Sequence, residues 1–184
     1  MNKIQTFTLT DLKRNNDLRR EEQKKRLISW LIFLLAAAVL VGLDLLFKSW
    51  AAANLQGQPS RTLIPGILGL TYTRNTGAAF GVLANFAFAR SFLIIVKIVL
   101  MCGILWVYQR IPHEKEYWLV RVPTILIFAG GIGNLHDRII LGYVRDMLRF
   151  LFINFPIFNL ADVFVVVGCF AGAFVMFFIV KDFP

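Results

Sequence analysis

The chain has 184 residues and a formal net charge of +9, and 58% of its residues are hydrophobic, including 18 phenylalanines. This apolar share exceeds the roughly 45–50% that is usual in soluble domains, so the composition indicates a membrane protein. Two cysteines within apolar runs (Cys102, Cys169) and two isolated histidines (His113, His136) give no metal-site spacing, which disfavours a zinc hydrolase and predicts no metal and no cofactor.

The first 26 residues form a basic tail. They hold eight of the 20 Lys and Arg residues, with four acidic residues among them. Aromatic side chains that could stack on bases do not interleave these charges, so the tail does not predict a nucleic-acid partner. We interpret residues 1–26 as a solvated cytoplasmic tail that sets the orientation of the chain in the membrane.

Four apolar segments follow, and each is about long enough to cross the hydrocarbon core as a helix. They cover residues 27–47, 91–108, 118–135 and 157–180. Four spans return the chain to the side on which it started, so both termini are expected in the cytoplasm. The sequence therefore predicts an all-α membrane protein with one four-span domain over residues 27–180 and outward segments at 48–90 and 136–156.

The two outward segments are more than linkers. Residues 68–73 (LGLTYT) have strand composition and 74–77 (RNTG) indicate a turn, so the first segment predicts a small extracytoplasmic β platform. The second segment mixes charges with large apolar residues, which predicts an amphipathic piece lying on the membrane surface. Pro156 is expected to begin the last helix, where its missing N–H costs nothing.

Polar residues gather at the outer membrane face in this topology. An ionisable residue in a span is costly and indicates function by default. Such residues are expected at the outer ends of three spans and in the last outward segment, where all of them can converge: Asp44, Asn134, Asp137, Arg138, Asp146, Asn159 and Asp162.

Two carboxylates that share a poorly solvated site do not both ionise easily, so one becomes an acid and the other a base. Aspartic proteases use this arrangement to activate water against an amide. Asp162 has no charged neighbour in sequence before Lys181, which makes it the strongest candidate for a catalytic carboxylate. The spacing leaves open whether Asp137 or Asp146 is its partner.

Structural roles compete with catalytic ones for several of these residues. Asp137 can pair with Arg138, and Asp146 can form a surface salt bridge with Arg145 or Arg149. Asp44 and Lys48 are four residues apart on one helix face, as in many interfacial ion pairs. Lys97, in the second span, can be explained by snorkelling or polar packing.

Several motifs, in this order, resemble the signal peptidase II family of lipoprotein signal peptidases. They are LDLLFK at 43–48, RNTGAAF at 74–80, GGIGNLHDR at 130–138, GYVRD at 142–146 and FNLAD at 158–162. The resemblance implies a bacterial inner-membrane aspartic endopeptidase with four spans and no metal. Such an enzyme cleaves diacylglyceryl-modified prolipoproteins just before the lipidated cysteine and is blocked by globomycin-type peptides.

The resemblance also implies roles for residues. Asp146 and Asp162 match the catalytic aspartates, in a site near the outer leaflet, and the implied partners of the protein include membrane lipids. The remaining motif residues match supporting or substrate-contacting positions: Asp44, Lys48, Asn75, Gly77, Asn134, Asp137, Arg138 and Asn159. Arg145 stands where the family usually has valine, and as a cation beside Asp146 it is expected to favour the ionised carboxylate.

Two other functions are possible for such a chain. A small ion-coupled transporter would use Asp162 in a proton relay, and would need polar residues running to the inner side of the membrane. A non-catalytic lipoprotein-binding protein would bind the lipidated substrate without cleaving it.

Overall fold

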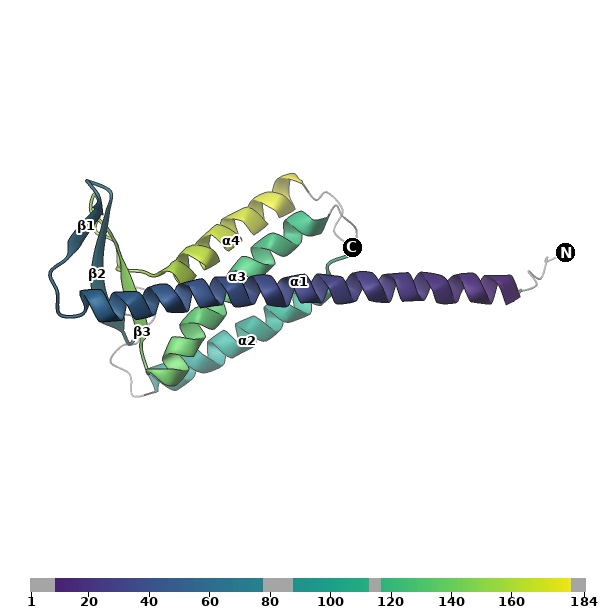
Figure 1. Cartoon of the computed structure of the whole chain (residues 1–184), viewed down its shortest axis with the longest axis horizontal. Coiled ribbons are helices and arrows are strands. Elements are labelled where there is room, and N and C mark those ends of the chain that lie inside the picture. The colour runs from purple at the N-terminus through teal and green to yellow at the C-terminus, as the bar shows by residue number, and fades with distance from the viewer. Residues whose placement is uncertain (1–8, 78–87, 113–116, 180–184) are drawn as a thin grey trace.

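The computed structural model describes residues 9–77, 88–112 and 117–179 (Figure 1). Parts of the predicted tail, the first outward segment and the end of the last span lie outside them. The described helices and strands are α1 (Leu9–Leu55), β1 (Arg61–Ile64), β2 (Leu68–Asn75), α2 (Ala89–Arg110), α3 (Trp118–Ile140), β3 (Val144–Phe150) and α4 (Leu160–Phe178).

The four helices confirm the predicted spans. Each of them is long and apolar enough to cross a membrane. In Figure 1, α2 and α4 lie on either side of α3, and α1 runs across them. Because α3 contacts all three other helices, it forms the centre of the bundle and places its polar residues where the other elements meet.

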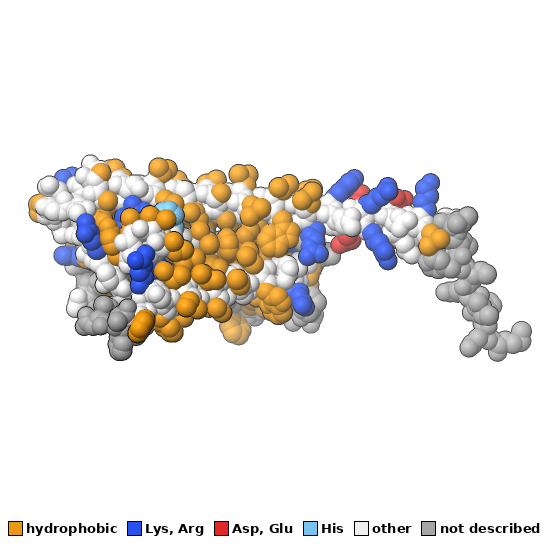
Figure 2. Space-filling model, turned by 90° about the horizontal axis from the view of Figure 1, so that it is seen from below, with side chains coloured by type: hydrophobic (Ala, Val, Ile, Leu, Met, Phe, Trp, Pro, Cys, Tyr) orange, Lys and Arg blue, Asp and Glu red, His pale blue; other side chains and the backbone are white. Residues whose placement is uncertain are grey.

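Helix α1 is much longer than the span predicted at residues 27–47. Its 47 residues extend for about 70 Å at 1.5 Å per residue, against a hydrocarbon core of about 30 Å. The tail is helical from Leu9 onward, so α1 projects beyond the bundle and carries the basic side chains there (Figures 1 and 2). Residues 9–26 contain no glycine or proline, so nothing in the sequence ends the helix there.

An apolar surface covers the face of the bundle that Figure 2 shows, between two ends that carry charged side chains. Side chains such as Leu35, Leu46, Phe170 and Phe177 are at least 70% exposed. So much contiguous apolar surface is unfavourable in water and is expected of helices that face lipid.

A three-stranded antiparallel sheet, in the order β1-β2-β3, lies at the end of the bundle away from the basic extension (Figure 1). Strand β2 confirms the strand predicted at 68–73. Strand β3 forms within the segment predicted to be amphipathic, with its charged residues Arg145 and Asp146 bound to polar groups and its next two residues in an apolar cluster. Met147 and Leu148 pack with Leu70 against Ala51 and Leu55 near the end of α1.

The last helix begins later than predicted. The expectation that Pro156 starts α4 is wrong, since the first helical residue is Leu160 and Asn159 is its N-cap. Phe158 is still extended and pairs with Leu148 of β3, donating to its carbonyl at 2.9 Å. This pairing fixes the start of α4 beside β3, so Asp162 lies in the first turn of the helix.

Helices α3 and α4 approach closely at Gly130. A Cβ atom at this position would meet the carbonyl oxygen of Ala161 and would come within 2.8 Å of Cγ2 of Val165. The absence of a side chain therefore sets the spacing between α3 and the residue that precedes Asp162.

Gly130→Ala is expected to destabilise the fold by about 1–3 kcal/mol, because overpacking forces backbone shifts. It should also lower turnover, since the shift displaces Asp162. Thermal unfolding in detergent and a cleavage assay measure both effects. Gly103→Ala is the matched control, because no heavy atom lies within 4 Å of the added Cβ. Equal behaviour of the two variants would contradict this account.

Candidate active site

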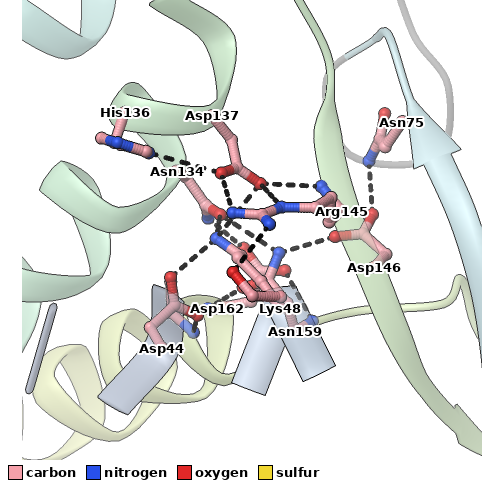
Figure 3. Close-up of polar contacts among 12 residues, drawn as sticks. Asp44, Lys48, Asn75, Asn134, His136, Asp137, Arg145, Asp146, Asn159 and Asp162 are labelled. Carbon is pink, nitrogen blue, oxygen red and sulfur yellow. Dashed lines mark hydrogen bonds and ion pairs between the residues drawn. The ribbon is translucent and has the colours of Figure 1, made fainter. Parts of the chain in front are cut away.

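One asparagine contacts both of the aspartates that the motifs single out (Figure 3). The side-chain amide of Asn159 donates to Oδ1 of Asp146 at 2.6 Å. Its Oδ1 accepts from the backbone N–H of Asp162 at 3.0 Å, and its own backbone N–H donates to Oδ2 of Asp162 at 3.1 Å. Asn159 thus holds the two carboxyl groups on either side of itself.

Asp162 occupies the third position of α4 and completes a capping box with Asn159. Its second oxygen, Oδ1, accepts from the side-chain amide of Asn134 at 2.7 Å. Each oxygen therefore receives one donor, and the helix N-terminus adds a partial positive charge. These contacts hold the carboxyl group of Asp162 in one orientation at the start of α4.

Asp146 lies on β3 and is only 1% exposed. Besides Asn159, Asn75 of β2 donates to its Oδ2 at 2.9 Å. Asp146 pairs with Thr73 across the two strands, so Asn75, two residues further on, is its diagonal neighbour on the same face. Burial raises the pKa of Asp146 to about 6; the charge of Asp162 adds to this, while the amide donors and Lys48 oppose it.

Asn134 is oriented by a buried lysine. Its Oδ1 accepts from Nζ of Lys48 at 2.9 Å and from the amide of Asn159 at 3.1 Å. Because two donors face the oxygen, the amide nitrogen must point the other way, toward Asp162. Lys48 therefore acts on the site through Asn134.

The predicted pair between Asp44 and Lys48 is confirmed, at 2.7 Å, but it is fully buried instead of interfacial. Lys48 also lies 3.9 Å from Asp137. Oδ1 of Asp44 accepts from the backbone N–H of Ala161 at 2.9 Å, which joins α1 to the start of α4. The pair thus fixes the helix that carries Asp162.

The expected pairing of Asp137 with Arg138 is wrong. Asp137 instead receives two side-chain hydrogen bonds from Arg145, at 2.8 and 3.0 Å, and one from the backbone N–H of Arg145 at 3.0 Å. Arg145 also donates to Ser49 of α1 at 3.2 Å. It therefore ties β3 to both α3 and α1.

Arg145 does not act on Asp146 as expected. Successive residues of a strand point to opposite faces, so the guanidinium of Arg145 lies on the side away from the Asp146 carboxyl. Burial raises the pKa of Asp146 to about 6, so the net effect of its surroundings is opposite to the ionised carboxylate expected beside a cation. Asp146 has amide partners in place of the predicted surface salt bridge with Arg145 or Arg149.

Arg138, Gly77 and Asn75 line one side of the site. Arg138 is 6% exposed and donates to the carbonyl of Gly77 at 2.8 Å. The N–H of Gly77 donates to Oδ1 of Asn75 at 3.1 Å, which leaves the amide nitrogen of Asn75 facing Asp146. The predicted supporting residues thus all contact the site or one another.

Arg90 was not predicted to belong to the site's framework. It donates to the carbonyls of Arg138 and Ile139 at 3.1 and 2.9 Å, and so joins the start of α2 to the end of α3. The signal available in the sequence was an arginine that faces outward against the positive-inside bias. That signal does not identify its partner.

A groove of about 550 Å³ opens beside Asp146. Residues 73–77 and residues 154–157 line it together with Asp146. Its walls offer backbone groups of β2 and of the segment before α4, which suits an extended peptide. Among the residues that the structure describes, no group of three or more His, Cys, Asp or Glu side chains is placed to hold a metal ion.

Comparisons with known proteins agree with these observations. The family model described as signal peptidase (SPase) II matches residues 36–178. The lipoprotein signal peptidase of Streptococcus thermophilus strain CNRZ 1066 is 42% identical over 133 residues, which cover 72% of this chain and 84% of that protein. The lipoprotein signal peptidase of Enterococcus faecalis is 41% identical over 138 residues, with coverages of 74% and 82%.

A solved structure described as a bacterial membrane enzyme is similar to this fold, with a TM-score of 0.69 and 27% identity over 80% of this chain and 94% of that one. These likenesses and the four apolar helices indicate a bacterial membrane protein. They do not favour the transporter or the non-catalytic alternative. The chain belongs to the signal peptidase II family of aspartic-type peptidases.

Proposed function

We propose that the protein is a membrane aspartic endopeptidase that removes the signal peptide from diacylglyceryl-modified prolipoproteins, cleaving just before the lipidated cysteine. Asp146 and Asp162 are its catalytic residues. The observation that carries the proposal is the position of Asn159, which contacts both carboxyl groups. The two groups have different surroundings, because Asp146 lies on a strand and Asp162 lies at a helix N-terminus.

The different surroundings of the two aspartates assign the roles of general base and general acid. Asp162, with a donor on each oxygen and at a helix N-terminus, is the general base that takes a proton from water. Asp146, whose pKa burial raises to about 6, carries the proton of the pair and donates it to the substrate carbonyl oxygen. Water oxygen then bonds to the carbonyl carbon and gives a neutral tetrahedral diol.

The intermediate collapses by the reverse exchange. Asp146 takes back a hydroxyl proton as the carbonyl re-forms, and Asp162 gives its proton to the leaving nitrogen as the C–N bond breaks. The pair therefore ends in its starting state, with one proton on Asp146.

The supporting residues hold the reacting groups in place. We assign the groove beside Asp146 to the peptide chain around the scissile bond, with Asn75 and Gly77 near the substrate backbone. Arg138 is positioned by Gly77 to neutralise charge near the pair. Asp44, Lys48, Asn134 and Asp137 act through one another to orient Asp162.

The proposed topology places both termini in the cytoplasm and the aspartates near the outer leaflet of the inner membrane. It rests on the basic residues at the end of α1 opposite to the sheet (Figure 2). The acyl chains of the substrate then remain among membrane lipids while the scissile bond reaches the aspartates. Globomycin-type peptides are expected to compete for the groove.

The pH dependence of cleavage tests the assignment of acid and base. Asp146 must be protonated to act as the acid, so kcat/KM should fall about tenfold per pH unit above a pKa of about 6. A bound substrate excludes water and raises the pKa of Asp146 further, so kcat should fall only at higher pH. If kcat/KM instead rose with pH through this region, Asp146 would be the base.

The proposed function itself is tested with purified protein and a lipidated prolipoprotein. A gel shift measures the loss of the signal peptide, with and without a globomycin-type inhibitor. We expect cleavage that depends on the diacylglyceryl group and that the inhibitor blocks. Binding of the precursor without cleavage would contradict the proposal.

A further inference from the structure

The second span carries one charge that the proposed mechanism does not use. Lys97 stands alone between Arg90 and Arg110, among apolar residues of α2. A lysine within a span costs about 2.5–3.5 kcal/mol on insertion scales, so its presence requires an explanation.

Lys97 lies on the face of α2 that packs against α3. Met101, one turn later on the same face, occupies the space beside Gly131 of α3, where a Cβ would meet its side chain. Lys97 is partly buried, whereas Ile95 and Val99 on the opposite face are 60% and 64% exposed. Its side chain therefore faces the bundle, which excludes simple snorkelling along lipid as the explanation.

The charges that act on Lys97 belong to the active site. They are Arg138, Asp162 and Lys48. Lys97 nevertheless forms no hydrogen bond or ion pair with any residue in the described part of the chain, although Lys48 has three such partners. An ammonium has three N–H donors, so the partner of Lys97 is expected to be a hydrogen-bond acceptor that arrives with the substrate.

The depth of Lys97 indicates which acceptor this is. Arg90 bonds to the end of α3, so the outer ends of α2 and α3 lie level. Lys97 follows Arg90 by seven residues, or about 10 Å of helix, and so lies deeper in the bundle than the sheet that carries Asp146. The ester carbonyls of a diacylglyceryl group lie between acyl chains in the hydrocarbon and a scissile bond at the aspartates, which is the same level.

We propose that Lys97 is a specificity-determining residue that donates hydrogen bonds to the ester carbonyl oxygens of the substrate's diacylglyceryl group. The inference rests on the proposed function, since it names what recognises the lipid of that substrate. It adds a site on α2 to a centre otherwise built from α1, α3, α4 and the sheet.

The experiment compares two precursors with the same peptide, one with a diacyl (ester) glyceryl group and one with a dialkyl (ether) glyceryl group. The wild type is expected to show a KM roughly tenfold lower for the ester, as one charged hydrogen bond provides. Lys97→Met should reduce this ratio to about one, with kcat changed less than twofold. Lys97→Arg keeps donors and should keep part of the preference.

The ratio of the KM values for the two precursors does not depend on how much of the variant protein folds. Ile95→Met, on the lipid-facing side of the same helix, should leave the ratio unchanged. A KM ratio that is unchanged in Lys97→Met would overturn the inference. An equal loss of cleavage on both precursors would also overturn it, because Lys97 would then be a counter-ion of Asp162. Failure of the proposed function differs from both, because the wild type would then cleave neither precursor.

Discussion

Asp162→Asn is expected to lower kcat for a lipidated prolipoprotein by about 10⁴-fold, and Asp146→Asn by a similar factor, because each removes a proton carrier of the reaction. Asn cannot act as a base or an acid at neutral pH. Single-turnover cleavage of purified precursor measures the loss. Asp17→Asn, which removes a carboxylate from the exposed tail, is the matched control and should retain full activity.

Folding of the two variants is separable from their chemistry. The backbone N–H of residue 162 still bonds to Asn159, so α4 keeps its cap in Asp162→Asn. Binding of a globomycin-type peptide should therefore persist in both variants. Retention of more than a tenth of wild-type turnover by either variant would remove that aspartate from the catalytic pair.

Lys48→Met is expected to destabilise the protein by about 3–5 kcal/mol, because it leaves buried acids without their partner. Lys48, Asp44 and Asp137 are all fully buried, and Lys48 also orients Asn134. Asp137 keeps Arg145, so Asp44 suffers most from the loss. Thermal unfolding in detergent micelles measures the change.

Two further variants make this expectation specific. Adding Asp44→Asn to Lys48→Met should recover much of the loss, because the unpaired charge is removed while the oxygen that accepts from Ala161 remains. Lys25→Met breaks an exposed pair with Glu22 at 3.5 Å and should change stability by less than about 1 kcal/mol. Similar losses in Lys25→Met and Lys48→Met would contradict the role given to burial.

The sequence predicts most of the architecture because membrane spans are long and uniform. Each of the four apolar segments is a helix in the structure, with ends displaced by a few residues or, in α1, by many. The strand at β2 is predicted by its own composition. Strand β3 is not, because the sequence VRDMLRF has no regular alternation of charged and apolar residues, and the strand depends on pairing with β2 and packing against the end of α1.

The site could be predicted as a set of residues but not as a set of contacts. The motifs name Asp146 and Asp162, and the structure brings both to Asn159. The pairing of each basic side chain with an acidic one depends on how β3 packs against the other elements. Neighbours in sequence suggested Asp137 with Arg138 and Arg145 with Asp146, but the packing of β3 beside the end of α3 pairs Asp137 with Arg145, across eight residues.

The start of α4 shows the same limit. A proline before an apolar run is a good helix start, and Pro156 suggested one. The capping box of Asn159 and Asp162, together with the pairing of Phe158 to β3, moves the start to Leu160. Both signals are present in the sequence, but only the tertiary contact decides between them.

The double variant Asp146→Asn/Asp162→Asn tests most directly whether the two aspartates work as one unit. Its rate of cleavage should be no lower than that of either single variant, because residues that share one proton lose their common function together. If the two losses instead multiplied, so that the double variant fell by the product of both factors, the aspartates would act independently and the shared-proton mechanism would be wrong.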